Sequence, residues 1–319
     1  MIQRRTLALI LLFLGLSLQL PLARPARAAD LDRIEQRMMG DEGDARWMRD
    51  QDLEELRGEL NEALNERPNS TRALILRGIV HMKLRRLRSA RADFEQAVRG
   101  QPRNALAHYN LALALERLGQ YGDARDSYER AVLLDAGLAP AQYNLGRIYE
   151  NSGDPKRAES AYYAAWLALP KSTRILNSLG NVRFKQGDYR GAMIYYDEAK
   201  ATAPGSGIVL HNRALTLEYL QRYEDALVSY QEATEASPKW EDPRLGLARC
   251  AYRLNKWDKA EEALAPILEA KGKDGEQARL LHEAVIAQRE GRPVPGAKIE
   301  TPEEPAQEAD DAPAKPEEK

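Results

Sequence analysis

Histidine and cysteine supply many of the metal-binding and nucleophilic side chains of proteins, and this chain of 319 residues contains few of either. The four histidines and the one cysteine are His81, His108, His211, His282 and Cys250. No two of them lie at the spacing of a metal-ligand pair. His282 and Glu283 begin like the helix of a zinc protease, but Ile286 stands where that motif needs its second histidine. We therefore predict no metal site.

The chain also lacks the local patterns of nucleophilic and phosphate-binding sites. Cys250 lies between Ala248 and Ala251 in a predicted helix, so we interpret it as a buried small hydrophobe. The alternative, a reactive thiol, would need exposure and a lowered pKa. No strand is predicted that could carry a nucleophile elbow or precede a glycine-rich phosphate loop. The sequence thus predicts a protein without enzyme activity and without a cofactor.

Side chains suited to binding a peptide recur instead through the middle of the chain. Amides can donate to and accept from a peptide backbone, tyrosines add contact area, and arginines favour carboxylates. Asn144 follows Asn110 at a spacing that recurs along the chain, and Asn212 follows Asn144 at twice that number of residues. The candidate peptide-binding residues are Tyr109, Asn110, Leu113, Arg117, Tyr143, Asn144, Arg147, Asn151, Asn177, Asn181, Lys185, Asn212, Arg249 and Arg253. The asparagines could instead serve packing or helix ends, and the sequence leaves both interpretations open.

We name the number of residues from Asn110 to Asn144 the repeat interval. The same interval separates successive members of rows of apolar residues and of turn residues. Three rows keep it: Pro68, Pro102, Ala136, Pro170, Pro204, Pro238 and Gly272; Ala90, Ala124, Ala158, Ala192, Ala226 and Ala260; and Phe94, Tyr128, Tyr162, Tyr196, Tyr230 and Leu264. A fixed interval of this size is the signature of a stacked repeat architecture. Such an array predicts a surface for binding another macromolecule.

Each repeat unit is predicted to contain two helices. In the third period the first helix covers roughly residues 140–152, and Gly153 ends it because glycine readily takes the left-handed conformation. Asp154 can cap the second helix, and Pro155 at its first position loses no hydrogen bond. The corresponding stop positions elsewhere are Gly119, Gly187 and Asn255.

Small residues are predicted to set the packing of the paired helices. A row in the first helices faces the alanine row of the second helices: Gly78, Ala112, Gly146, Gly180, Ala214 and Ala248. Two helices approach closely only where the side chains at their crossing are small. The aromatic row would fill the gap beside the crossing, with about 150–250 Å² buried per ring. One unit cannot cover this face alone, so we expect each unit to stack on the next.

These residues resemble the tetratricopeptide repeat. The third unit shows the pattern best: Asn144, Leu145, Gly146 and Tyr149, then Gly153, Asp154, Pro155, Ala158, Tyr162, Ala165 and Pro170. The resemblance implies an all-α, right-handed superhelical solenoid of helix-turn-helix repeats, with the first helices lining the concave side. The sequence departs from the family pattern at Arg77, Arg183, Arg213 and Ala136. The three arginines could loosen the packing or extend along their aliphatic stems to solvent or a partner.

Six full units are predicted, at residues 71–104, 105–138, 139–172, 173–206, 207–240 and 241–274. Residues 29–70 are predicted to form helices that include a degenerate first repeat. Residues 275–290 resemble the helix that caps the last unit. Residues 291–319 are predicted to be a disordered tail, since residues 293–319 hold eight acids, three lysines and no aromatic residue.

The N-terminus predicts export. Two arginines precede an apolar run over residues 6–20, and residues 25–29 offer a small-residue cleavage site after Ala28. Removing residues 1–28 takes away four arginines and changes the formal charge from −2 to −6, which gives no electrostatic case for nucleic acid. We expect a periplasmic or secreted protein with no transmembrane helix in the mature chain; the alternative is an anchor formed by an uncleaved N-terminal segment.

The function predicted from these features is a non-enzymatic scaffold or adaptor. It would bind a peptide or helix of a protein partner in its concave groove, in the assembly of an envelope complex. The alternative is an accessory subunit that presents substrate to a separate modifying enzyme. A basic turn is interpreted as solvated, with contact to anionic lipid or envelope polymer as the alternative: Lys83, Arg85, Arg86, Arg88 and Arg91.

Overall fold

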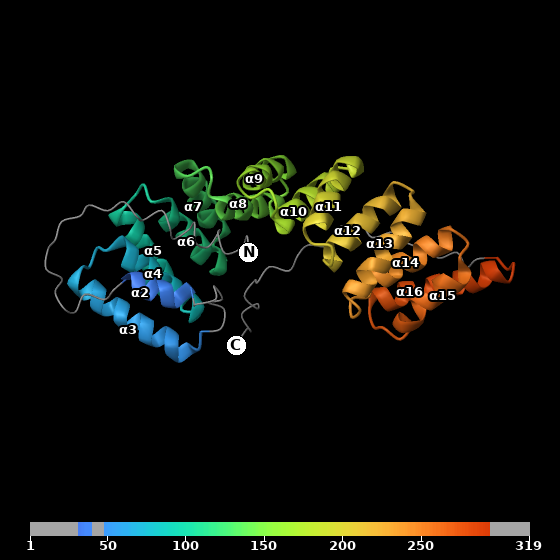
Figure 1. Cartoon of the computed structure of the whole chain (residues 1–319), viewed down its shortest axis with the longest axis horizontal. Helices are drawn as coiled ribbons and strands as arrows, with labels where there is room; N and C mark the ends of the chain where they lie inside the picture. Colours follow the sequence, from blue (N-terminus) through green and yellow to red (C-terminus); the bar gives the residue numbers. More distant parts are fainter. Residues whose placement is uncertain (1–30, 40–47, 294–319) are drawn as a thin grey trace. The chain divides into compact units, whose positions relative to one another are not determined.

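The computed structural model describes residues 31–39 and 48–293, and these residues form fifteen α-helices and no strand (Figure 1). The all-α class predicted from the repeat pattern of the sequence is confirmed. The predicted export signal at residues 1–28 and the tail from residue 294 onward lie outside the described residues. None of the described helices is long and apolar enough to cross a membrane.

The helices follow one another with short connections. They are α2 (Leu31–Met39), α3 (Asp50–Glu66), α4 (Thr71–Lys83), α5 (Leu87–Gly100), α6 (Ala105–Arg117), α7 (Tyr121–Leu134), α8 (Ala139–Asn151), α9 (Pro155–Ala168), α10 (Thr173–Lys185), α11 (Tyr189–Thr202), α12 (Gly207–Tyr219), α13 (Tyr223–Ala236), α14 (Asp242–Arg253), α15 (Trp257–Leu264) and α16 (Lys273–Arg289). From α4 to α15, each predicted repeat contains one even-numbered first helix and one odd-numbered second helix.

The chain divides into two compact units between Ile148 and Tyr149, within α8. Unit 1 holds α2 to α7 and most of α8, and unit 2 holds the end of α8 and the helices that follow. Helices that are consecutive in sequence pack against each other from α3 to α7 in unit 1 and from α9 to α16 in unit 2. Each unit is therefore a stack of helical hairpins.

The aromatic row lies inside these stacks. Phe94 and the four tyrosines that follow it at the repeat interval all have no exposed surface. A Cβ atom on Gly180 would lie 2.5 Å from Cε1 of Tyr196, and one on Gly78 would lie 2.4 Å from Cε1 of Phe94. Such contacts leave no room for a side chain. At Gly78 and Gly180 the prediction that small residues permit a close approach of the paired helices is confirmed, but the nearest side chain is that of the aromatic row and not of the alanine row.

A left-handed residue ends every first helix from α4 to α14. The predicted stop positions Gly119, Gly153, Gly187 and Asn255 all have positive φ. Two further residues at the same repeat position were not foreseen: Arg85 has a φ of 57° and Gln221 a φ of 59°. The repeat imposes this turn even where the side chain disfavours it.

Replacing Gln221 with glycine is expected to raise the free energy of unfolding by about 0.5–1 kcal/mol. Glycine relieves left-handed strain of about 1–2 kcal/mol, and its greater freedom in the unfolded chain takes back about half of that gain. Urea denaturation measures the difference. Gln186, the C-cap of α10 with a φ of −78°, provides the control, because glycine there relieves no strain. Equal losses of stability in Gln221→Gly and Gln186→Gly would contradict the prediction.

Two of the three arginines that depart from the family pattern bridge neighbouring second helices. Arg77 on α4 donates to Asp93 on α5, with 2.9 Å from Nε to Oδ2, and to Asn61 on α3, with 2.9 Å from NH1 to Oδ1. Arg213 on α12 occupies the same repeat position and contacts Asp197 on α11 and Ser229 on α13. These arginines tie three helices together, so in these two repeats they do not loosen the packing.

The ends of the array differ from the internal repeats. α15 stops at Leu264 and continues as a short 3₁₀ turn over Ala265–Ile267, because Pro266 cannot donate the hydrogen bond that a longer helix needs. α16 begins at Lys273, two residues before the predicted start of the capping helix. At the other end, Ile34 of α2 has no exposed surface, and Arg72 on α4 donates to Glu35 of α2.

Candidate functional site

A hydrogen-bonded cluster in unit 1 contains two of the predicted peptide-binding residues. The Tyr128 hydroxyl on α7 donates to Oε2 of Glu116 on α6 at 2.8 Å. Arg147 on α8 lies 3.2 Å from the other carboxylate oxygen of Glu116, and Nδ2 of Asn144 donates to the Tyr128 hydroxyl at 3.2 Å. Asn144 and Arg147 thus bind other residues of the array, and each remains half-buried.

The neighbouring candidates on α6 divide between the interior and the surface. Asn110 is 8% exposed and donates to the carbonyl oxygen of Leu106 at 2.8 Å, within its own helix. Tyr109 is half-buried, with its ring centroid 6.0 Å from that of Tyr128. Burial of the hydroxyl, together with the nearby Glu116 carboxylate, raises the pKa of Tyr109 to about 12. Tyr109 is therefore a neutral hydrogen-bonding group at physiological pH.

Half-buried apolar side chains continue along the first helices of unit 1. We name the following set the unit-1 face: Ile75 and Ile79 on α4, Tyr109 and Leu113 on α6, and Tyr143 on α8. They occupy two repeat positions, because the repeat interval separates Ile75, Tyr109 and Tyr143, and it also separates Ile79 from Leu113. Arg117 at the end of α6 is exposed and forms no ion pair with any residue that the structure describes. An apolar surface with a cation beside it results.

The corresponding side chains of unit 2 are buried. Asn212 has no exposed surface, and its Nδ2 donates to Oδ1 of Asn177 at 3.0 Å and to Oδ1 of Asn181 at 3.2 Å. The Tyr196 hydroxyl donates to the same oxygen of Asn181 at 2.7 Å. Asn177 and Asn181 are 1% and 2% exposed. The expectation that these three asparagines line an open surface is not met, because they satisfy one another inside the stack.

A buried ion pair lies next along unit 2. Arg249 on α14 and Glu218 on α12 are 3% and 5% exposed, and the guanidinium holds both carboxylate oxygens at 3.0 and 2.9 Å. The Tyr230 hydroxyl donates to Glu218 at 2.9 Å. Burial alone would lower the pKa of Arg249, but the hydrogen bonds and charge of Glu218 outweigh it and raise that pKa. Arg249 therefore belongs to the interior and not to an open groove.

The remaining candidates of unit 2 are exposed or nearly so. They are Asn151, Lys185 and Arg253, which share one repeat position at the ends of α8, α10 and α14. Lys185 pairs with Glu150 at 3.2 Å. Arg253 forms no ion pair with the described residues. Whether these three residues bind a peptide stays a prediction.

His211 is buried among aromatic rings of unit 2. It is 2% exposed, and its ring centroid lies 4.5 Å from that of Trp240 and 5.6 Å from that of Tyr230. Burial, with a smaller contribution from Arg249, lowers the pKa of His211 to about 3. No group of three or more potential metal ligands is found within residues 31–39 and 48–293. His211 is therefore a neutral core residue.

The burial of His211 predicts a pH-dependent stability. Between pH 3 and its ordinary value of 6.5, the unfolded chain protonates this histidine while the folded chain does not. The folded state therefore loses about 1 kcal/mol of stability between pH 7 and pH 5.5 through this group. Urea denaturation at the two pH values measures the loss. His211→Phe is expected to reduce it by that amount, and an unchanged pH dependence in this variant would contradict the assignment.

Cys250 is also an interior residue. It has no exposed surface, and burial, with a smaller effect of Glu218, raises the pKa of its thiol. Both observations oppose reaction as a thiolate. The interpretation of Cys250 as a buried small hydrophobe agrees with this environment.

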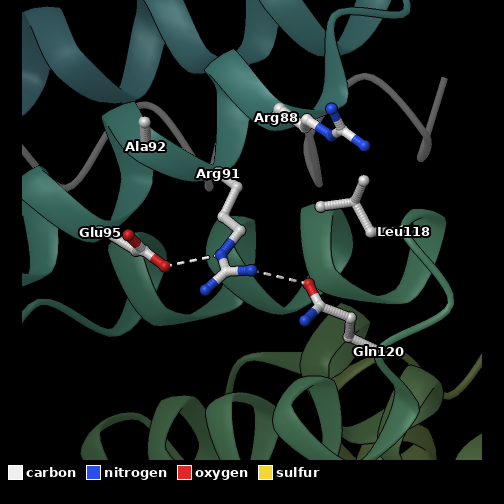
Figure 2. Close-up of a pocket in the computed structure, with 6 residues that line it drawn as sticks. All are labelled: Arg88, Arg91, Ala92, Glu95, Leu118 and Gln120. Atoms are coloured by element: carbon white, nitrogen blue, oxygen red, sulfur yellow. Dashed lines mark hydrogen bonds and ion pairs between the residues drawn. The ribbon is translucent and has the colours of Figure 1, made fainter.

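The basic turn borders a shallow hollow in unit 1 (Figure 2). The hollow is lined by Arg88, Arg91, Ala92, Glu95, Leu118 and Gln120. Nε of Arg91 donates to Glu95 at 2.6 Å, and its NH1 donates to Gln120 at 2.9 Å. Arg86 pairs with Glu54 on α3. Because carboxylates already neutralise two of its arginines, this turn is closer to a solvated surface than to a binding site for a polyanion.

Two groups of residues around the site were not predicted from the sequence. Glu116, Glu150 and Glu218 share one repeat position, and each accepts a hydrogen bond from the row tyrosine twelve residues later. Ile75 and Ile79 belong to the unit-1 face by their repeat positions. The repeat interval could have identified the isoleucines, because each lies one interval before a residue that was already a candidate. It could also have identified the glutamates, because they share one repeat position.

Comparison with known families identifies the repeat. Two models of the tetratricopeptide repeat match the chain, one at residues 75–140, 118–172 and 143–207, and the other at residues 220–284. These matches cover more than half of the sequence. The chain belongs to the tetratricopeptide repeat family. No curated protein matches its sequence.

Several solved structures share the fold. The chain is 18% identical to PilF of Pseudomonas aeruginosa, with a TM-score of 0.57 over 70% of this chain and 99% of that one. It is 19% identical to PilW, described as a type IV pilus biogenesis factor, with a TM-score of 0.56 over 66% and 98% of the two chains. It is 20% identical to YrrB, described as having an unusual peptide-binding site, with a TM-score of 0.53 over 58% and 95%. At these identities the likeness concerns the fold.

Proposed function

We propose that this protein is a non-enzymatic scaffold that binds an apolar segment of a partner protein at the unit-1 face. One observation carries the proposal: the first helices of unit 1 present half-buried apolar side chains, whereas the residues at the same repeat positions in unit 2 are buried. Tyrosine and arginine side chains are enriched at protein interfaces. Binding is therefore assigned to unit 1.

The chemistry of the unit-1 face defines the partner. Ile79, Leu113 and Tyr143 favour apolar side chains, presented by a helix or an extended segment. Arg117, which has no carboxylate partner among the described residues, favours an acidic residue next to the apolar ones. The expected ligand is an amphipathic segment with a carboxylate.

We place this binding in the cell envelope, on the strength of the export signal predicted at residues 1–28. The work proposed for the protein is to hold components of an envelope complex together. PilW, which shares the fold, is described as a biogenesis factor of the type IV pilus, and YrrB as having a peptide-binding site. The second candidate function is an accessory subunit that presents its bound protein to a separate modifying enzyme.

Site-specific photo-crosslinking in cells tests the proposal. A photoreactive phenylalanine analogue is placed at Tyr143 on the unit-1 face, and in a separate variant at Tyr121 on α7. Tyr121 is a matched control, because it is a tyrosine of the same unit, is 62% exposed and lies outside the face. We expect a discrete crosslinked protein from position 143 and none from position 121.

Charge substitutions then distinguish a specific crosslink from a chance one. Leu113→Arg places a charge within the unit-1 face and is expected to remove the crosslink from position 143. Leu133→Arg places the same charge on a leucine of α7 that is 73% exposed, and the crosslink should persist. Crosslinks of equal strength from both positions, or no effect of Leu113→Arg in a folded variant, would overturn the proposal.

A further inference from the structure

The last three repeats of unit 2 carry half-buried aromatic rings along one edge, and we infer that the proline-rich residues 302–305 of the same chain dock there. Each ring lies where a first helix ends or where the following second helix begins. All of them pack against one hydrophobic core cluster. We name this set the aromatic edge: Tyr189, Tyr219, Tyr223, Tyr252 and Trp257. It is separate from the unit-1 face and does not depend on the function proposed there.

The repeat places a cation among these rings. The ring centroids of Tyr189 and Tyr219, which belong to successive repeats, lie 5.0 Å apart. One repeat interval further along the chain, the equivalent residues are Tyr223 and Arg253. Because equivalent residues of a repeat array take equivalent places, Arg253 is placed beside the ring of Tyr223.

Arg253 is the unpaired charge of the aromatic edge. It is exposed and forms no ion pair with the described residues. The acidic residues at the second positions of α13 and α15 are already paired, Glu224 with Lys256 and Asp258 with Arg289. The edge therefore combines aromatic surface with a positive charge that is open to a carboxylate.

The sequence beyond α16 has the matching chemistry. Residues 302–305, which lie outside the described residues, read Pro-Glu-Glu-Pro. Proline-rich segments with this spacing favour the polyproline II conformation, and such segments dock on surfaces lined with aromatic rings. The two glutamates between the prolines match Arg253. A later pair of prolines, Pro313 and Pro316, encloses an alanine and a lysine, so its charge does not suit the edge.

The end of α16 brings this segment within reach of the edge. α16 packs against α14 and α15. Arg289, its last residue, lies 3.4 Å from Asp258, so α16 ends beside the start of α15, where Trp257 lies. The chain from Pro293 to Pro302 spans up to about 30 Å, whereas the axes of packed helices are about 8–10 Å apart. Such a short connection gives an effective concentration in the millimolar range, so a weak affinity is enough for docking within one chain.

Photo-crosslinking from the segment itself, in the purified full chain, tests the inference. A photoreactive phenylalanine analogue replaces Ala306, which follows Pro305, and mass spectrometry locates the crosslinked residues. We expect crosslinks to residues 219–223 and 252–257. The same analogue at Ala314, between the later prolines, is the matched control, and the crosslinks to these residues should be lost.

Substitutions in the full chain then identify the contacts. Arg253→Glu should reduce the crosslink from position 306 at least about threefold, because repulsion replaces an attraction. Arg244→Glu is the matched control, because Arg244 also lies on α14 without an ion pair to the described residues, but at the opposite end of the helix. Replacing Pro302 and Pro305 with alanine should reduce the crosslink as well, whereas the same change at the later pair of prolines should leave it.

A mixture of isotope-labelled and unlabelled chains identifies the source of the docked segment. Crosslinks that stay within one isotopic species support docking within the chain. Crosslinks that join the two species would assign the edge to the segment of a second copy and overturn the inference. Absence of crosslinks to the aromatic edge, equal crosslinking from positions 306 and 314, or equal effects of Arg253→Glu and Arg244→Glu would overturn it as well.

Discussion

Replacing Glu218 with alanine is expected to lower the free energy of unfolding by about 3–5 kcal/mol. The carboxylate accepts both hydrogen bonds of the Arg249 guanidinium and the hydroxyl of Tyr230. Arg249 is only 3% exposed, so its charge cannot reach water when the carboxylate is removed. The loss is therefore the cost of leaving a buried cation and a buried hydroxyl without their partner.

Urea denaturation at pH 7 measures this effect, and Glu116→Ala is the matched control. Glu116 occupies the same repeat position and also accepts from a row tyrosine and an arginine. Its side chain and that of Arg147 are 17% and 25% exposed, so water can reach the arginine once the carboxylate is gone. Glu116→Ala should therefore lose only about 1 kcal/mol.

Removing both charges of the buried pair is the complementary experiment. Glu218→Leu combined with Arg249→Met should recover most of the stability lost in Glu218→Ala, since apolar residues of similar size need no counter-charge. A double variant as unstable as the single one would mean that the pair does not account for the loss. Equal losses in Glu218→Ala and Glu116→Ala would contradict the role assigned to burial.

Replacing Ala158 with leucine is expected to lower the free energy of unfolding by about 1–3 kcal/mol, the usual effect of overpacking. Ala158 lies on α9 in the alanine row and has no exposed surface. In the following repeat the paired helices approach closely, since even a Cβ on Gly180 would lie 2.5 Å from the ring of Tyr196. Three added carbon atoms can fit only if the two helices move apart.

Thermal denaturation followed by circular dichroism measures this destabilisation. Ala168→Leu provides the control, because it adds the same atoms at an exposed position at the end of α9. The control should unfold close to the parent protein, whereas Ala158→Leu should unfold several degrees lower. Native-like stability of Ala158→Leu would show that the alanine row does not lie at the helix crossing.

The two units differ in the residues that they carry at the same repeat positions. At the repeat positions of the unit-1 face, the first helices of unit 2 carry interior residues such as Asn177, His211 and Arg249. In unit 1 the same positions carry apolar side chains that are only half-buried, such as Leu113 and Tyr143. The first arrangement stabilises the stack, and the second leaves apolar surface partly exposed.

Most of the fold could be predicted from the sequence because its determinants are local and repeated. The repeat interval sets which alanines and glycines lie at the crossings and which aromatic residues fill the space beside them. Turn chemistry located the ends of the first helices at Gly119, Gly153 and Gly187. Each of these properties depends on residue type and spacing, and six copies in phase make the pattern unmistakable.

The binding surface could not be assigned in the same way, because burial depends on what neighbouring repeats place against a side chain. Asn144 and Asn212 share one repeat position, yet Asn144 is half-buried beside Tyr128, while Asn212 has no exposed surface between Asn177 and Asn181. Sequence alone therefore determined the helices, their pairing and the positions that face inward. Only the tertiary structure decided which first-helix positions remain partly exposed. That exposure depends on contacts between residues of different repeats, such as the ion pair of Arg249 with Glu218.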